Sequence, residues 1–243
     1  KPQTALLMCG MNSNGQLGLG DFLARVSPQA VSTLSSSPLI DVVCASRSTL
    51  ALDADGRVYA WGKGEDGTLG TGERSSVTKP RLVEALLRHP ISKLACRGAH
   101  VLALSTKGEV WAWGRNEDGQ LGVINADGSN AHSAVPARVS GLSGVRVRLI
   151  ACGRTHSVAV DADGALFSWG SGEDGVLGHG DRRERTTPAR CEALANRKIT
   201  KLACGSRHTL ALAENGEVMS WGWGVYGQLG HGDKLSRPLP VVV

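Results

Sequence analysis

One glycine-rich segment of this chain has the spacing of a dinucleotide-binding loop. Residues 61–72 read WGKGEDGTLGTG, which places Gly62, Gly64 and Gly67 in the pattern Gly-x-Gly-x-x-Gly directly after an apparent strand. In a dinucleotide site, such a loop holds phosphate at the N-terminus of a helix that opens at the third glycine. Here the third glycine is followed by TLGTGERSSVTKP, which is full of helix-breaking residues. The segment therefore predicts a turn, and no nucleotide cofactor.

A second pattern, Cys-x-x-x-His, has the residue types of a metal site. It occurs in three places, and a fourth copy has serine instead of histidine: Cys96/His100, Cys152/His156, Cys204/His208 and Cys44/Ser48. Zinc takes three or four converging ligands, and each copy offers at most two. The pattern favours a small buried cysteine on an inner strand and a histidine that hydrogen-bonds the turn, with no metal. Cys9 and Cys191 lie outside this series. No disulfide framework is indicated, and reduced thiols suit a cytosolic or nuclear protein.

Three adjacent pairs of carboxylates could serve in acid–base chemistry. They are Glu65/Asp66, Glu117/Asp118 and Glu173/Asp174. Each pair occupies the same position of a recurring glycine segment, which is typical of solvated turn residues. The chain also has no Gly-x-Ser-x-Gly nucleophile motif. We therefore predict no catalytic residue and no enzymatic activity of the chain itself.

Both the glycine and the cysteine segments belong to an internal repeat. The glycine segments begin at residues 9, 61, 113, 169 and 221, which are 52, 52, 56 and 52 residues apart, and the cysteine segments begin at 44, 96, 152 and 204. The repeat divides the single domain into units of approximately 9–60, 61–112, 113–168, 169–220 and 221–243, the last of them partial. One structural unit of about 52 residues is therefore copied along the chain.

Each unit has the pattern of short antiparallel strands. Residues 208–222, HTLALAENGEVMSWG, form two alternating runs around a tight Asn-Gly turn, and other units have Asp-Gly or Lys-Gly there. An apolar run precedes this hairpin and a proline-led run follows the glycine segment, so each unit has four strands. Four strands in a repeated unit are typical of a β-propeller blade. The middle glycine position holds Asn12, Gly64, Asn116, Gly172 and Gly224. This alternation of Gly with Asn predicts a left-handed backbone there.

The bulk composition sets broad limits on function. The chain has 243 residues, of which 41% are hydrophobic and 20% charged, and it contains no run of about 18 apolar residues that would span a membrane. The formal charge of +5 is spread along the chain. A basic balance of this kind favours acidic partners only weakly.

The combined motifs, Trp-Gly-x-[Gly/Asn]-x-x-Gly-x-Leu-Gly-x-Gly and Cys-Gly-x-x-His-[Ser/Thr], resemble those of the regulator of chromosome condensation repeat family over essentially the whole chain. The resemblance implies an all-β, seven-bladed propeller with four short antiparallel strands per blade. At the observed period, this chain supplies four to five blades of the seven. We therefore expect a partial propeller whose open strand edges promote self-association.

Successive chain reversals are expected to bring the turn after each cysteine and the loop after each Trp-Gly to one face. The turns carry Arg47, Arg97, Arg154 and Arg207, and the loops carry the three acidic pairs. In the last loop Trp223 and Tyr226 replace residues that are polar in most of the other copies. Two interpretations stay open for this charged ring: ion pairing between loops, and docking of a partner by charge complementarity. Two also stay open for the aromatic pair: packing against a neighbouring loop, and anchoring a partner.

The resemblance implies several functions, because members of the family use the same blades differently. One member is an exchange factor for the Ran GTPase that uses an inserted β-wedge and also binds nucleosomes. Here the insertion is four residues within 123–139, too small for that wedge. Another senses ultraviolet light with indoles whose matching positions here are Ser46, Gly98, Arg154 and Ser206, which argues against photoreception. Others are docking modules of HECT ubiquitin ligases.

We therefore expect a non-catalytic protein-interaction scaffold, cytoplasmic or nuclear, that docks a protein on the loop face. A small GTPase and a ubiquitin-pathway protein are the partners that the resemblance implies. The first alternative is a guanine nucleotide exchange factor for a Ran-like GTPase. The second is chromatin or nucleosome binding, which would show a steep dependence on salt.

Overall fold

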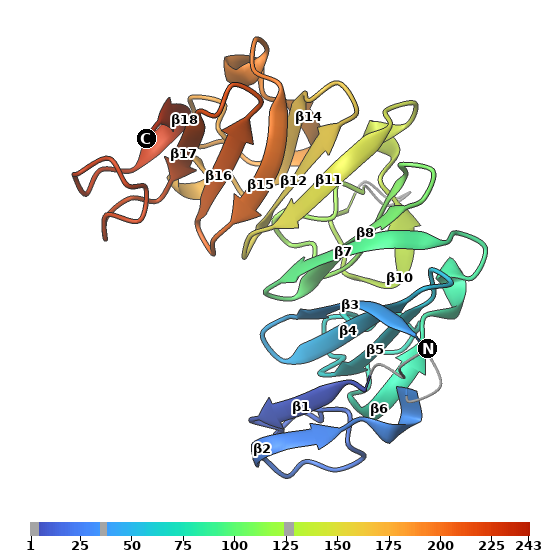
Figure 1. Cartoon of the computed structure of the whole chain (residues 1–243). Coiled ribbons are helices and arrows are strands. Elements are labelled where there is room, and N and C mark those ends of the chain that lie inside the picture. The colour runs from blue at the N-terminus through green and yellow to red at the C-terminus, as the bar shows by residue number, and fades with distance from the viewer. Residues whose placement is uncertain (1–4, 35–37, 124–128) are drawn as a thin grey trace.

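The computed structural model describes residues 5–34, 38–123 and 129–243 of the chain. Within these ranges the protein consists of eighteen strands and five 3-10 helices of three residues each. The strands form four antiparallel sheets of four strands and one sheet of two strands (Figure 1). None of the helices in the described ranges has the length and apolar character needed to cross a membrane. The predicted all-β fold of repeated four-stranded units is confirmed.

The four complete sheets are called blades 1 to 4 in chain order. Blade 1 contains β3 (Leu39–Cys44), β4 (Ser48–Asp53), β5 (Val58–Gly62) and β6 (Val77–Leu82). Blade 2 contains β7 (Ile91–Arg97), β8 (His100–Ser105), β9 (Val110–Gly114) and β10 (Ser133–Arg138). Blade 3 contains β11 (Val147–Cys152), β12 (His156–Asp161), β13 (Leu166–Gly170) and β14 (Arg185–Arg190). Blade 4 contains β15 (Ile199–Cys204), β16 (His208–Ala213), β17 (Val218–Gly222) and β18 (Arg237–Val242).

The remaining elements frame these blades. The two-stranded sheet contains β1 (Leu7–Gly10) and β2 (Arg25–Ala30), which correspond in sequence to the third and fourth strands of a blade. Four helices follow a last strand: η1 (Ser32–Leu34), η2 (Glu84–Leu86), η3 (Ser140–Leu142) and η5 (Glu192–Leu194). The fifth, η4 (Glu173–Gly175), lies in the β13–β14 loop. The repeat units predicted from the sequence begin at the Trp-Gly residues, and these residues lie within the third strand of each blade. Each predicted unit boundary therefore falls inside a blade rather than between two blades.

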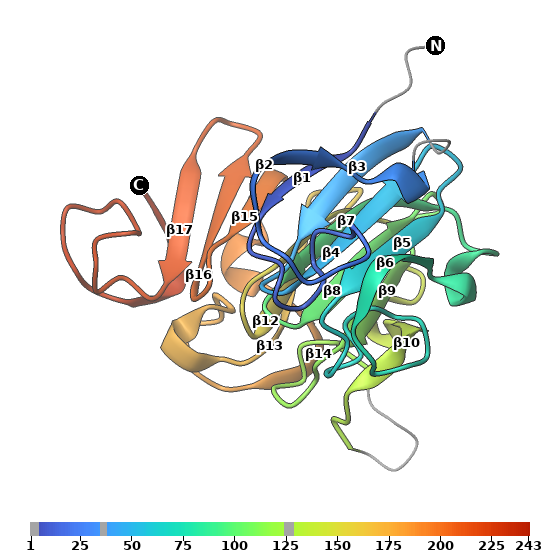
Figure 2. The ribbon, with the colours of Figure 1, turned by 90° about the horizontal axis from the view of Figure 1, so that it is seen from below.

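The blades are arranged side by side in an open arc (Figure 1). The first strands β3, β7, β11 and β15 contact one another in series along the inside of this arc. Figure 1 shows the two-stranded sheet next to blade 1 at one end of the arc and blade 4 at the other end, and Figure 2 shows the same ribbon from below. The described residues thus form a partial propeller of four complete blades and two further strands.

Tight turns and burial explain why the central hairpin of each blade is so regular. The hairpin of blade 1 pairs Leu50 with Ala60 and turns at Gly56, whose φ of +79° suits glycine. Every residue of β4 and of β8 is buried, because neighbouring blades cover both faces of the sheet. These strands consequently have continuous runs of buried residues rather than the one-sided burial of an exposed sheet.

A buried tryptophan links each blade to the preceding one. The indole N–H groups of Trp61, Trp113, Trp169 and Trp221 donate to the carbonyls of Gln16, Thr68, Gln120 and Val176, at 2.8, 2.9, 3.0 and 2.8 Å. Each indole also lies against a glycine with positive φ two residues after that carbonyl. A Cβ on Gly70 would lie 2.8 Å from Nε1 of Trp113, and equivalent glycines have similar distances. We call this contact the Trp–Gly latch.

The structure corrects the interpretation of the alternating Gly and Asn position. Gly172 has a φ of −94°, and neither Asn12 nor Asn116 has a positive φ, so the backbone there is not left-handed. Glycine occurs because a Cβ at Gly172 would lie 2.1 Å from the carbonyl oxygen of Arg183. Where asparagine occurs, its side chain closes the loop: Oδ1 of Asn116 accepts from the backbone N–H of Leu121 at 2.9 Å. Space and hydrogen bonding, rather than backbone handedness, select these two residues.

The Cys-x-x-x-His segments connect successive blades. Nε2 of His100 lies 3.0 Å from Oγ of Ser157, and Nε2 of His156 lies 3.0 Å from Oγ1 of Thr209. The expectation that these histidines bond their own turn is therefore wrong, because the ring reaches the hydroxyl of the next blade. The Ser157 hydroxyl itself donates to the Gln120 carbonyl at 2.7 Å, so the His100 Nε2–H must be the donor.

This arrangement holds both histidines neutral. Burial lowers the pKa of His100 to about 4 and that of His156 to about 3. The Nδ1 atoms of both rings are buried and find no hydrogen-bond partner among the described residues, so a second proton there would be a buried, unsolvated charge. Burial likewise raises the pKa of the Cys96 thiol to about 12. Neutral imidazoles and protonated thiols suit a structural role.

The Trp–Gly latch predicts a large difference between two glycine substitutions. Gly70 and Gly72 both have positive φ, but a Cβ on Gly72 has nothing within 4 Å. Gly72→Ala should cost about 1–2 kcal/mol for the backbone alone. Gly70→Ala should cost about 1–3 kcal/mol more because it also displaces the Trp113 indole. Urea denaturation followed by tryptophan fluorescence measures both, and equal midpoints for the two variants would contradict the latch.

The buried histidines predict a loss of stability in mild acid. As pH falls below the ordinary histidine pKa of 6.5, the unfolded chain binds protons that the folded chain does not. The free energy of unfolding should therefore decline between pH 7 and pH 5, by roughly 2 kcal/mol per histidine, until the folded protein also protonates near pH 4 and pH 3. The double variant His100→Gln/His156→Gln should show a flatter profile, and an unchanged slope would contradict this assignment.

The open ends of the arc predict self-association. Apolar side chains whose equivalents in the inner blades are less exposed lie there, among them Leu7 at 57% at one end and Val218 at 40% and Val243 at 56% at the other. We expect light scattering to give a mass above that of one chain, rising with concentration and persisting in 1 M salt because the contact is apolar. A monomer at all concentrations would be the contrary result.

Candidate interaction face

The turns after the cysteines and the loops after Trp-Gly lie at the same end of each blade. A backbone hydrogen bond joins the two segments in every blade. The bonds run from Lys63 N to Arg47 O at 2.9 Å, Arg115 N to Ala99 O at 2.8 Å, Ser171 N to Thr155 O at 2.9 Å and Trp223 N to Arg207 O at 2.7 Å. We call this side of the molecule the loop face. The placement expected from the sequence is confirmed, although binding at these residues stays a prediction.

At the boundary of blades 3 and 4, charged and aromatic side chains form one cluster. Arg207 pairs with Glu173 at 3.2 Å and with Asp174 at 2.7 Å. Its guanidinium carbon lies 5.1 Å from the centroid of the Trp223 ring, within cation–π range. Trp223 meets Tyr226 edge to face at 4.9 Å, and Tyr226 is 77% exposed. The sequence-predicted residues Arg207, Trp223 and Tyr226 are thus brought together with one acidic pair.

The other three predicted arginines do not repeat this arrangement. Counted from the preceding cysteine, Arg47 and Arg207 are third, Arg97 is first and Arg154 is second. Among the described residues, no ion pair is found for Arg47, Arg97 or Arg154. Arg97 instead reaches from blade 2 to blade 4, where it approaches Oγ of Ser206 and the carbonyl of Cys204, each at 3.4 Å. Of the four predicted arginines, Arg207 is therefore the one that forms an ion pair between loops within the described ranges.

The remaining acidic pairs are compensated mainly by cations of their own loops. Glu65 pairs with Lys63 at 2.7 Å, and Glu117 pairs with Arg115. Partial burial raises the pKa of Asp118. Arg115 and Arg154 oppose this rise of the Asp118 pKa, so Arg154 acts electrostatically on Asp118 although the described residues show no ion pair between them. Glu65 and Glu117 thus pair with cations of their own loops rather than with the arginines nearer the inside of the arc.

His132 joins two loops and was missed by the sequence analysis. Its Nδ1 lies 3.6 Å from Asp66 and its Nε2 lies 3.3 Å from Glu117. It belongs to the four-residue insertion region, part of which (124–128) lies outside the described residues. The equivalent positions of the other blades hold Ser76, Glu184 and Ser236, so the histidine in one copy was the signal that could have identified it.

Two adjoining hollows open on the loop face. One, of about 410 Å³, is lined by residues that include Cys96, Arg97, Arg154 and Ser206. The other, of about 360 Å³, is lined by residues that include Arg47, Lys63, Asp66, Arg115 and Arg154. Ser46, Gly98 and Arg154 line both. Ser46, Gly98, Arg154 and Ser206, the positions that correspond to the indoles of the ultraviolet sensor, all line the hollow of about 410 Å³. That hollow is polar and basic here.

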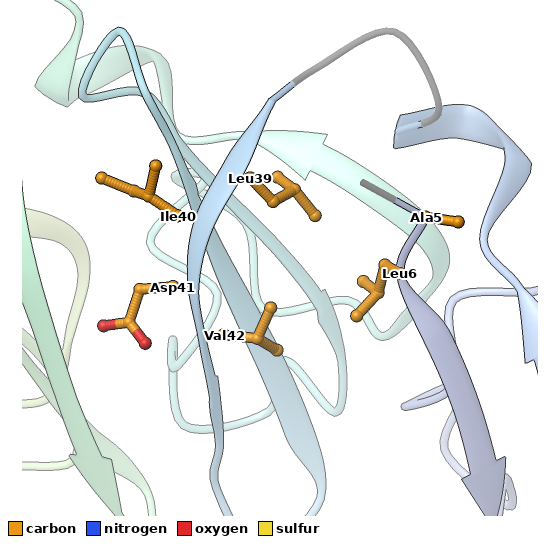
Figure 3. A pocket seen from close by; sticks show the side chains of 6 residues that line it. All are labelled: Ala5, Leu6, Leu39, Ile40, Asp41 and Val42. Atoms are coloured by element: carbon orange, nitrogen blue, oxygen red, sulfur yellow. The ribbon is translucent and has the colours of Figure 1, made fainter. Parts of the chain in front are cut away.

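A third hollow has a different character. It measures about 320 Å³ and lies between β1 and β3, where Leu39 and Val42 face Leu6 (Figure 3). Both strands lie at the open end of the arc. Its lining is mostly aliphatic, so it supplies no chemistry comparable with that of the loop face.

Comparisons with known proteins agree with this architecture. The chain matches the RCC1-like domain over residues 3–243. It is 40% identical to the Ultraviolet-B receptor UVR8 of Arabidopsis thaliana over 95% of this chain and 52% of that protein. It is 39% identical to the human E3 ubiquitin-protein ligase HERC2 over 97% of this chain and 5% of that protein. The chain thus spans about half of one relative and a small part of the other.

Solved structures show the same fold. The chain superimposes on human WBSCR16 with a TM-score of 0.86 and 27% identity, covering 99% of this chain and 63% of that one. It superimposes on yeast RCC1 (Prp20), solved with Kap60, with a TM-score of 0.81 and 27% identity, covering 93% and 53%. Together with the repeated blades and the Trp–Gly latch, these matches show that the chain belongs to the RCC1-like domain family.

Proposed function

We propose that the chain is a non-catalytic interaction scaffold that docks another protein on its loop face. The observation that carries this proposal is the cluster of Arg207, Trp223 and Tyr226. Tyr226 is 77% exposed and rests on Trp223, which in turn lies against Arg207. Tyrosine, tryptophan and arginine dominate the binding energy of protein interfaces, particularly when they gather at one place.

The fold itself does not require these side chains. The blades are held by the buried Trp61, Trp113, Trp169 and Trp221, and Trp223 is not one of them. Tyr226 faces solvent, Trp223 is half-buried beside it, and neither takes part in the Trp–Gly latch. An exposed aromatic side chain of this kind is a better candidate for an interface than for the core. The match to 5% of HERC2 further supports a role as one module within a larger protein.

Exchange activity on a Ran-like GTPase is the alternative. It is favoured by the likeness to Prp20p of Saccharomyces cerevisiae, whose structure was studied with its binding properties to Gsp1p and histones. The same likeness supports nucleosome binding as a second alternative and a nuclear or cytoplasmic location. A partner that is released by GTP or GDP would favour the exchange factor over the scaffold.

Affinity capture from a lysate, with the protein containing this chain as bait, tests the proposal. The double variant Trp223→Ala/Tyr226→Ala should capture at least tenfold less of a partner than the parent protein does. Truncating an interface anchor commonly weakens binding by more than about 1.4 kcal/mol per residue. The melting temperature should stay nearly unchanged.

The matched control is Leu87→Ala. Leu87 is also exposed, at 51%, but follows η2 at the opposite end of the blades from the loop face. This variant should capture the partner as the parent protein does. Equal capture by the parent and the double variant would place the interface elsewhere, and a large fall in the melting temperature would show that Trp223 and Tyr226 act in packing.

A further inference from the structure

Within the described residues, Arg47, Arg97 and Arg154 form no ion pair, because the arginines and the acidic pairs do not occupy matching positions in successive blades. The Arg207 position contacts the acidic pair of the preceding loop, Glu173 and Asp174. For Arg47, the corresponding positions of the preceding loop hold Ser13 and Asn14, which carry no charge. In blades 2 and 3, the residue equivalent to Arg207 is Ala99 or Thr155, so the acidic pairs before them find no arginine there.

The arginines that lack acidic partners converge on one place. Arg47 and Arg154 line the hollow of about 360 Å³, and Arg97 and Arg154 line the adjoining hollow of about 410 Å³. Lys63 and Arg115 line the first hollow as well, and Asp66 is the acidic residue of the two linings. The hollow of about 410 Å³ is lined by the turns between first and second strands, and that of about 360 Å³ extends from these turns to the Trp-Gly loops of blades 1 and 2.

The positive charge of Arg97 affects two histidines near it. Arg97 contributes to lowering the pKa of both His156 and His208, although burial is the larger cause for each. Three exposed arginines held around a concave surface repel one another and favour an anion between them. Hydroxyl and backbone N–H groups of the same turns, such as Ser46 and Thr155, are available to complete hydrogen bonds to its oxygens.

The surroundings of the hollows select the kind of anion. The Trp-Gly loops, between third and fourth strands, place Glu65, Glu117 and Glu173 farther from the inside of the arc than the arginine turns. A nucleic acid laid over the face would bring its phosphates against these exposed carboxylates. A short peptide segment can place a few carboxylates over the hollows and leave the acidic rim uncovered or paired with its own basic residues.

We propose that the two hollows lined by Arg47, Arg97 and Arg154 bind an acidic segment of the partner protein through its aspartate or glutamate side chains. This proposal rests on the proposed function and specifies the chemistry of the partner. Arginine suits the task because its planar guanidinium binds carboxylate through two parallel hydrogen bonds.

The test measures binding of a fluorescein-labelled octaglutamate peptide by fluorescence anisotropy at low salt. The variant is Arg47→Gln/Arg154→Gln in the full chain, and the control is Arg88→Gln/Arg190→Gln. The control removes the same charge from exposed arginines at the opposite end of the blades. We expect the pocket variant to weaken binding at least tenfold and the control to weaken it less than twofold. Circular dichroism melting confirms that each variant folds.

Two further measurements compare the acidic peptide with a nucleic acid and with free phosphate as the bound anion. An oligothymidylate of the same charge should bind at least tenfold more weakly than the peptide, and inorganic phosphate at 10 mM should displace less than half of the bound peptide. No peptide binding, equal losses in the two variants, or tighter binding of the oligonucleotide would each overturn the proposal. The capture experiment with Trp223 and Tyr226 is independent of this result, so the acidic segment can be disproved while the docking face stands.

Discussion

The hydrogen bond from a buried indole to a carbonyl of the preceding blade is the contact on which the rest of the structure depends. Three of these bonds span 45 residues and the fourth spans 49. The fourth encloses the four-residue insertion, so the β9–β10 loop absorbs the extra length and the latch is kept. Because each indole requires a bare glycine beside it, the spacing of tryptophan and glycine sets the period of the whole chain.

Cross-blade bonds of the histidines add a second connection nearer the inside of the arc. His100 bonds Ser157, and Ser157 bonds the same Gln120 carbonyl that accepts from Trp169. The latch and the histidine bond therefore meet at one acceptor, which makes the junction of neighbouring blades a connected polar network within an apolar core. With the blades held in this way, the exposed ends of the turns and loops contribute little to the fold. Their charges are consequently free to differ from one blade to the next.

The fold could be predicted from the sequence because the latch, the tight turns and the Leu-Gly segments all recur at one interval. The placement of the turns and loops on one face followed from the same strand count. The error at Asn12 and Gly172 arose because glycine can signal either positive φ or a lack of space, and a sequence does not distinguish them. The ion pairs could not be predicted, because moving an arginine by one residue along such a short turn changes the residues that its side chain meets. The positions equivalent to His132 hold Ser76, Glu184 and Ser236, so the repeat offered no other histidine from which its ion pairs could be predicted.

The loop face consequently combines two regions that would contact a partner through different interactions. Around Arg207 the charges are paired and an aromatic surface is presented, which suits desolvated contacts that slow dissociation. Around Arg47, Arg97 and Arg154 the cations form no ion pairs and line a concave surface, which suits attraction of an oppositely charged partner over about 8 Å at physiological salt. Because both regions lie on one arc of rigid blades, a partner that satisfies both must place an apolar surface and an acidic segment at a set separation. Specificity would then come from that separation more than from either contact alone.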